Sequence, residues 1–183
     1  FRGAMAAAGV KSFQWSAPAG DPLEAAVLHA RYSDLAVGSQ PARKGPGAGF
    51  AGELANAVVM ESGRPVLFVP YIGAGKTMGE RVLIAWKDSR ESARAVADAL
   101  PFLKDAKSVL AIAVSPRSEE TVQEYVSDKA VEGFLRRHDV EATVSRMGAP
   151  DIASGEFLLS RAADFGADLI VMGGYSRPRL SRL

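Results

Sequence analysis

The segment that decides the fold is Asp168-Leu169-Ile170-Val171-Met172-Gly173-Gly174, in which an aspartate, four apolar residues and two glycines follow one another. A short run that is apolar at every position is typical of a strand covered on both faces. Val66–Val69 has the same character and is followed by Pro70. Such strands occur in parallel sheets with helices packed above and below. The two segments therefore predict an α/β fold.

Further short apolar runs, bounded by turn residues, predict more strands along the chain. They lie at Val10–Trp15, Leu35–Val37, Arg81–Trp86, Ser108–Val114 and Val140–Arg146. Helical periodicity and capping residues predict helices between these strands. The expected helices are Asp21–Arg31, Glu53–Glu61, Ser89–Phe102, Ser118–His138 and Asp151–Phe165. Alternating strands and helices indicate parallel strands joined by helical crossovers.

A pattern of helix, aspartate, short apolar strand and glycine occurs twice, ending at Asp34–Gly38 and at Asp168–Gly173. This repetition predicts two similar α/β units in tandem. We place the first unit at residues 1–70, a glycine-containing linker at 71–80 and the second unit at 81–183. We expect both units to be incomplete in this chain. The first would lack its opening strand and helix, and the second its last helix and strand.

Composition excludes several classes of protein. The 22 basic and 21 acidic residues give a net charge of +1, which argues against a general nucleic-acid binder. The absence of cysteine excludes disulfides, thiolate metal sites and a cysteine nucleophile. No apolar run approaches the roughly 20 residues of a membrane span, and the first residues do not have the pattern of a signal peptide. We expect a cytoplasmic protein that does not enter a membrane.

Motifs typical of enzymes are absent from the sequence. Gly73–Thr77 resembles the end of a P-loop, but Pro70 stands where the first glycine is needed, and a strand is predicted after it instead of a helix. We interpret that segment as a linker. His29 and His138 are far apart and have no metal-ligand spacing, and no Gly-x-Ser-x-Gly elbow is present. We therefore expect no catalytic residues and no metal site.

The candidate binding residues follow the carboxyl ends of the predicted strands, where ligands bind in open α/β sheets. They are Lys87, Asp88, Ser89, Val114, Gly173, Gly174, Ser176 and Arg177. Small residues in such a loop let a phosphate approach backbone N–H groups, and arginine suits phosphate recognition. A tight turn beside a solvated basic loop explains the same residues equally well. From the residues alone both interpretations stay open.

Arg81 to Ala95 resembles the opening strand and helix of a universal stress protein domain. Asp168 to Leu183 resembles the signature loop of that family, and Gly63 to Pro70 resembles the closing strand of a first domain in two-domain members. The resemblance implies tandem Rossmann-like units, similar to adenine nucleotide alpha hydrolases. Each unit would have an open parallel five-stranded sheet with helices on both faces. It further implies a homodimer, or an intramolecular pseudo-dimer, through sheet edges.

Some members of this family bind ATP through an aspartate after the first strand and a glycine loop. In this sequence Lys87 stands at the place of the aspartate, Gly173 matches the first loop glycine and Ser176 stands at the second. The leading hypothesis is a non-enzymatic stress-response protein that binds ATP, another nucleotide or another anion in its second unit. The alternatives are an interaction protein without nucleotide binding and a slow ATPase that uses Asp88.

Overall fold

The structure is a computed structural model that describes residues 1–40, 47–70, 75, 77–115, 122–148 and 154–174 of the chain. The chain forms two compact units. One consists of Phe1–Leu35 and Pro41–Arg64, and the other of Ala36–Gln40 and Pro65–Leu183. The boundaries 1–70, 71–80 and 81–183 stay a prediction.

The first compact unit contains helices α1 (Arg2–Ala7), α2 (Pro22–Arg31) and α3 (Ala48–Glu61). Asp21 begins α2 as expected, because its side chain accepts a hydrogen bond of 2.7 Å from the N–H of Leu23. The Arg31 guanidinium donates to the Glu61 carbonyl at the end of α3, at 3.3 Å. Helix α3 begins at Ala48, earlier than the predicted Glu53.

The predicted strand Val10–Trp15 is wrong, since this segment has no strand conformation in the structure. Its apolar residues do not pack into a sheet. Phe13 and Trp15 instead contact the ring of Phe1, with ring centroids 5.6 and 5.1 Å apart. A few apolar residues alone do not make a strand, because a strand also needs a neighbour that accepts and donates its backbone hydrogen bonds.

The second compact unit contains two parallel sheets. A two-stranded sheet pairs β1 (Ala36–Ser39) with β2 (Val66–Val69). A four-stranded sheet has the order β5-β4-β3-β6. Its elements, in chain order, are β3 (Arg81–Trp86), α4 (Arg90–Asp105), β4 (Ser108–Ser115), α5 (Val122–Arg137), β5 (Ala142–Gly148), α6 (Ser154–Phe165) and β6 (Leu169–Met172).

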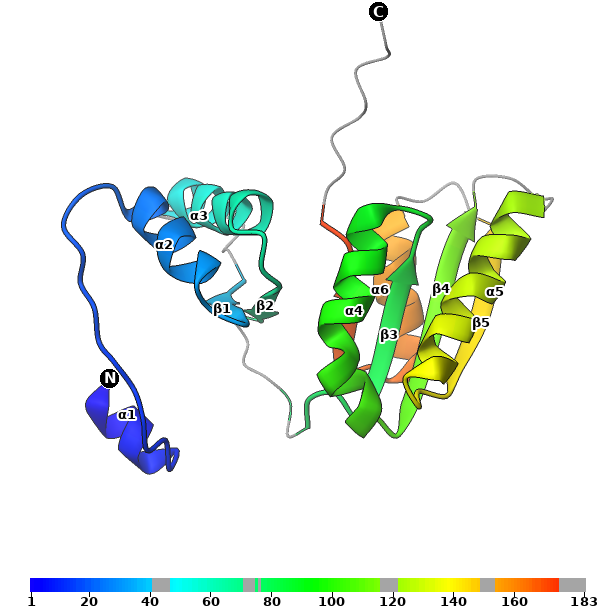
Figure 1. Ribbon diagram of the computed structural model, residues 1–183, viewed down its shortest axis with the longest axis horizontal. Helices are drawn as coiled ribbons and strands as arrows, with labels where there is room; N and C mark the ends of the chain where they lie inside the picture. The colour runs from blue at the N-terminus through cyan, green and yellow to red at the C-terminus, as the bar shows by residue number, and fades with distance from the viewer. Residues whose placement is uncertain (41–46, 71–74, 76, 116–121, 149–153, 175–183) are drawn as a thin grey trace, which may run out of the picture. The chain divides into compact units, whose positions relative to one another are not determined.

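Helices cover both faces of the four-stranded sheet (Figure 1). Val82 and Ile84 of β3 face α4 and α5, where they pack with Val96, Leu103 and Leu135. Leu83 points to the opposite face, toward Phe157 and Ala162 of α6. Residues of one strand therefore belong to two separate apolar cores, one on each face of the sheet. This is why Val82, Leu83 and Ile84 are all almost fully buried.

The predicted α/β architecture with parallel strands is confirmed. Strands β2, β3 and β6 have the predicted bounds, and β1, β4 and β5 lie within two residues of them. Helix α4 extends past Phe102 to Asp105 even though Pro101 lies inside it. The expected five strands per unit are not seen in the part of the chain that the structure describes. It contains one sheet of four strands and one of two.

Candidate functional site

The candidate site lies at the carboxyl edge of the four-stranded sheet. Strand β3 pairs with β4 on one side, reached through α4, and with β6 on the other, reached only later in the chain. The strand order thus reverses at β3, which makes the space beyond β3 and β6 the topological switch point of the sheet. Lys87–Ser89 follows β3 there, and Gly173 follows β6.

Ser89 begins helix α4 from this edge. Its backbone is extended, and its hydroxyl oxygen accepts a hydrogen bond of 3.2 Å from the N–H of Ser92. The N–H of Ser89 in turn donates to the carbonyl of Lys87, at 2.8 Å. This tight turn aims the first N–H groups of α4, and the positive end of its dipole, at the carboxyl edge.

Charged side chains surround this helix start. Lys87 and Asp88 are exposed. Arg90 forms an ion pair with Glu91, and the hydrogen bond from Arg90 is the main reason that the pKa of the Glu91 carboxyl lies below its usual range. Glu91 is therefore ionised at neutral pH and is already neutralised by Arg90. Lys87 and Asp88 add one exposed cation and one exposed carboxylate beside this helix start.

Gly173 is in direct contact with the start of α4. A Cβ atom at this position would lie 2.7 Å from the backbone nitrogen of Ser92 and 2.8 Å from the carbonyl carbon of Glu91. No side chain fits there without moving backbone. The glycine is thus explained by close packing of the β6 loop on the first turn of α4, and this packing brings the two loops of the candidate site together.

The other predicted site residues are placed only in part. Val114 lies in β4 beside Met147 of β5, at the same edge, and only its backbone is described. Gly174 follows Gly173 and is exposed. Ser176 and Arg177 lie outside the described residues.

Asp168 lies at the opposite, amino edge of the sheet and has a structural role. Its Oδ1 accepts hydrogen bonds from the N–H groups of Gly79 and Arg81, at 3.0 and 2.9 Å. Its Oδ2 accepts one from Glu80 at 3.2 Å. Burial alone would raise the pKa of Asp168, but these bonds and one from the Thr77 side chain outweigh it and hold the pKa below its usual range. The aspartate of the signature segment therefore holds the start of β3 against β6.

Sequence reasoning missed a polar cluster near the carboxyl edge. Arg146 of β5 forms a bidentate ion pair with Asp128 of α5, with N–O distances of 2.6 and 2.9 Å. Its guanidinium also lies 3.2 Å from a carboxylate oxygen of Glu124. The sequence does contain a sign of this cluster. Arg146 follows Ala142 and Val144 at alternate positions of the strand, and those two residues face the apolar core. A charge on the buried face of a strand requires a buried partner.

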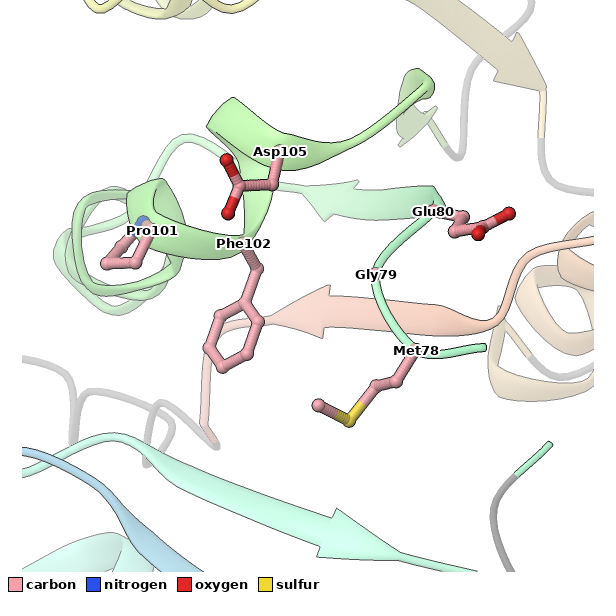
Figure 2. Close-up of a pocket in the computed structure, with 6 residues that line it drawn as sticks. All are labelled: Met78, Gly79, Glu80, Pro101, Phe102 and Asp105. Atoms are coloured by element: carbon pink, nitrogen blue, oxygen red, sulfur yellow. The ribbon is translucent and has the colours of Figure 1, made fainter. Parts of the chain in front are cut away.

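A small pocket lies at the amino edge, between the start of β3 and the end of α4 (Figure 2). Its volume is about 200 Å³, and it is lined by Met78, Gly79, Glu80, Pro101, Phe102 and Asp105. Ligand pockets are usually larger, roughly 300–1,000 Å³, and in open α/β sheets they lie at the carboxyl edge. We therefore do not place the site in this pocket.

The described residues also limit other kinds of site. Among them, no group of three histidine, aspartate or glutamate side chains has the arrangement of a metal site. No helix in the described ranges is both long and apolar enough to span a membrane. The absence of a helix after Thr77, where β3 starts instead at Arg81, agrees with the rejection of a P-loop.

No protein-family model matches the chain, and no curated protein sequence does either. Similarity to solved structures is clear. A universal stress protein from Archaeoglobus fulgidus DSM 4304 is 20% identical and superposes with a TM-score of 0.72 over 93% of this chain. The match covers 60% of the Archaeoglobus protein, so this chain spans less than two thirds of the length of that protein.

Two further solved structures match about half of the chain. One is a protein from the universal stress protein family of Burkholderia pseudomallei, 20% identical, covering 55% of this chain and 85% of its own, with a TM-score of 0.45. The other is a protein from Mycobacterium tuberculosis H37Rv, 18% identical, covering 58% and 80%, with a TM-score of 0.44. The superposition on the Archaeoglobus protein shows that, over nearly its whole length, this chain has the fold of a universal stress protein.

Proposed function

We propose that this chain is a non-enzymatic, cytoplasmic stress-response protein that binds a nucleotide or another phosphate-bearing anion at the carboxyl edge of its four-stranded sheet. One observation carries the proposal. The packing of Gly173 against Ser92 brings the β6 loop onto the first turn of α4, at the switch point of a parallel sheet. Helix starts at such points bind phosphate in many α/β proteins.

The charges at this edge support an anionic ligand. Lys87 is an exposed cation next to the start of α4, and Glu91 is paired with Arg90. At the start of α4 the N–H groups of Ser89 and Ser92 already donate to the Lys87 carbonyl and to the Ser89 hydroxyl. The N–H groups of Arg90 and Glu91 have no intrahelical acceptor. A phosphate at this edge would gain these donors together with the lysine charge.

Calorimetry with the 183-residue chain tests the proposal. ATP and inorganic tripolyphosphate are titrated separately, each with and without Mg²⁺, and thermal unfolding is followed in parallel. Binding of ATP alone indicates that the base and ribose contribute, whereas equal binding of both ligands indicates a general anion site. No heat and no thermal shift at millimolar concentrations of either ligand would refute binding.

A lysine variant locates the site. Lys87→Ala should weaken binding by about tenfold, since one charge-assisted hydrogen bond to phosphate is lost. Lys107→Ala is the matched control, because Lys107 is an exposed lysine at the amino edge whose ammonium group pairs with Glu80 at 2.8 Å. Equal effects of the two substitutions would show that general charge, and not this edge, attracts the ligand.

The absence of enzymatic activity is part of the proposal and has its own test. Slow ATP hydrolysis would need a carboxylate near the transferred phosphate, and Asp88 is the candidate at this edge. Measured release of phosphate that falls in Asp88→Ala, with ATP affinity unchanged, would make the protein an ATPase. If neither anion binds, light scattering decides whether the chain instead acts by assembling with a second copy.

A further inference from the structure

Helix α5 is attached to the sheet in two different ways along its length. In its second half, Val131 and Leu135 are only 3% and 0% exposed and belong to the apolar core. In its first half, the apolar side chains Val122, Tyr125 and Val126 are 82%, 53% and 58% exposed. Hydrophobic burial therefore holds the second half of α5 and contributes little to the first.

The first half of α5 is held by polar contacts. Among the described side chains of this half, Ser127 and Asp128 are buried. The indole N–H of Trp86 donates to the Ser127 hydroxyl at 3.1 Å, and Arg146 binds Asp128 through two hydrogen bonds of 2.6 and 2.9 Å. Arg146 also donates to the backbone carbonyl of Glu124 at 3.3 Å, one helical turn earlier.

The partners of these contacts form one row across the sheet. Trp86 of β3 is in register with Ala113 of β4, which is in register with Arg146 of β5. The long side chains of Trp86 and Arg146 thus flank the small, buried Ala113. Both long side chains contact α5, which lies along this side of the sheet in Figure 1. Arg146 and Asp128 are mostly buried, with side chains 16% and 12% exposed. Water competes weakly for such a pair.

We infer that the first two turns of α5, residues 122–129, open and close as a local unit for which Arg146 is the latch. Local opening requires breaking only the contacts that the opening segment itself makes. Here those contacts include the hydrogen bonds of Trp86 and Arg146 and the ion pair of Arg146 with Glu124, whereas opening the second half would expose the core around Leu135. Opening would bring Trp86 and Arg146 into water directly beneath the carboxyl edge.

Hydrogen exchange of backbone amides, read by NMR on the intact chain, tests this inference. The informative amides are those of residues 126–130, because the first four N–H groups of a helix have no intrahelical acceptor. Arg146→Met removes the charged contacts and keeps much of the side-chain volume. We expect it to speed exchange at residues 126–130 by about ten- to a hundredfold, with less than about a threefold change at 134–137 and in β3.

Arg136→Met is the matched control. Arg136 belongs to the same helix and pairs with Glu132 at 2.8 Å, but its side chain is 72% exposed and far from the latch. It should leave exchange at 126–130 unchanged. An Arg146→Met variant with equal acceleration in both halves of α5, or with none at 126–130, would overturn the inference.

Trp86→Phe covers the case in which Arg146→Met does not fold. This substitution keeps an aromatic ring, but it makes the side chain smaller and removes the indole N–H that binds Ser127. Loss of one neutral hydrogen bond should speed exchange at 126–130 by about fivefold, again with little effect at 134–137. A uniform response along α5 in this variant would show that the helix opens as one piece, which contradicts the latch.

Discussion

Asp168 allows a sharp test of how the amino edge of the sheet is held together. Its carboxylate accepts hydrogen bonds from three consecutive N–H groups, those of Gly79, Glu80 and Arg81. Asp168→Asn keeps the size of the side chain but removes its charge, and it turns one acceptor oxygen into an NH₂ group that faces N–H donors. At least one bond is lost and the remaining ones weaken.

The expected cost follows from the number and kind of these bonds. A hydrogen bond to a charged group contributes roughly 1.5–3 kcal/mol, and the partners here are half-buried or exposed, which reduces that value. We expect Asp168→Asn to lower the free energy of unfolding by about 2 kcal/mol at pH 7. Urea unfolding, followed by Trp86 fluorescence in a Trp15→Phe background, measures this value. Trp15 is 66% exposed and lies in the other compact unit.

The pH dependence provides a second, independent check. The pKa of Asp168 is lower in the folded chain than the value of about 3.9 expected when unfolded. Its contribution is therefore fully present above the unfolded pKa and is lost as pH falls through the folded pKa. The difference between wild type and Asp168→Asn should be constant from pH 7 to about 5 and shrink below pH 4.

The control is Asp164→Asn, in α6. Asp164 is 60% exposed and lies 3.5 Å from Arg161, so removing its charge should change stability by less than about 1 kcal/mol. A difference between wild type and Asp168→Asn that stays constant down to pH 2.5, or that equals the Asp164→Asn effect, would refute the role given to these hydrogen bonds.

Three further substitutions, one of them with a matched control, test the packing around α4 and the core. Gly173→Ala should destabilise the chain by about 1–3 kcal/mol, because its Cβ would lie 2.7 Å from the backbone nitrogen of Ser92. Gly155→Ala is the control and should stabilise the chain slightly, because Gly155 has open space around it. Thermal unfolding compares the two variants. Ser89→Ala should cost about 1 kcal/mol through loss of the α4 cap, and an unchanged melting temperature would contradict that capping role. Leu83→Ala should cost about 2–5 kcal/mol in urea unfolding, since Leu83 is 0% exposed; a loss under about 1 kcal/mol would mean that the core there collapses around the gap.

The sequence predicts strands well where they are apolar on both faces. Val66–Val69, Arg81–Trp86 and Leu169–Met172 have the expected bounds in the structure. Val82, Leu83 and Ile84 are buried, whereas Val66–Val69 contains no buried residue, so the pattern predicts the strand there but not its burial. Val10–Trp15 is predicted as a strand from its apolar residues Val10, Phe13 and Trp15. No described strand pairs with it.

The sequence predicts at which edge of the sheet the candidate residues lie, but not why Gly173 is a glycine. The rule that ligands bind beyond the carboxyl ends of strands depends only on strand order, and it placed Lys87, Ser89 and Gly173 at one edge. The reason for the glycine depends on Ser92, which is distant in sequence. A contact of this kind has no local signature, and a glycine suited to phosphate looks the same in sequence as one suited to helix packing.

These two roles of Gly173 need not compete, and their combination explains why the carboxyl edge is the better candidate than the amino edge. Packing Gly173 on the first turn of α4 fixes the distance between two loops that come from different crossovers of the sheet. An anion bound there would meet N–H donors that are already positioned, so little ordering cost would be added on binding. At the amino edge the equivalent donors, those of Gly79, Glu80 and Arg81, are already occupied by Asp168. The carboxylate of Asp168 thus occupies the donors of the amino edge, which supports placing the proposed anion site at the carboxyl edge.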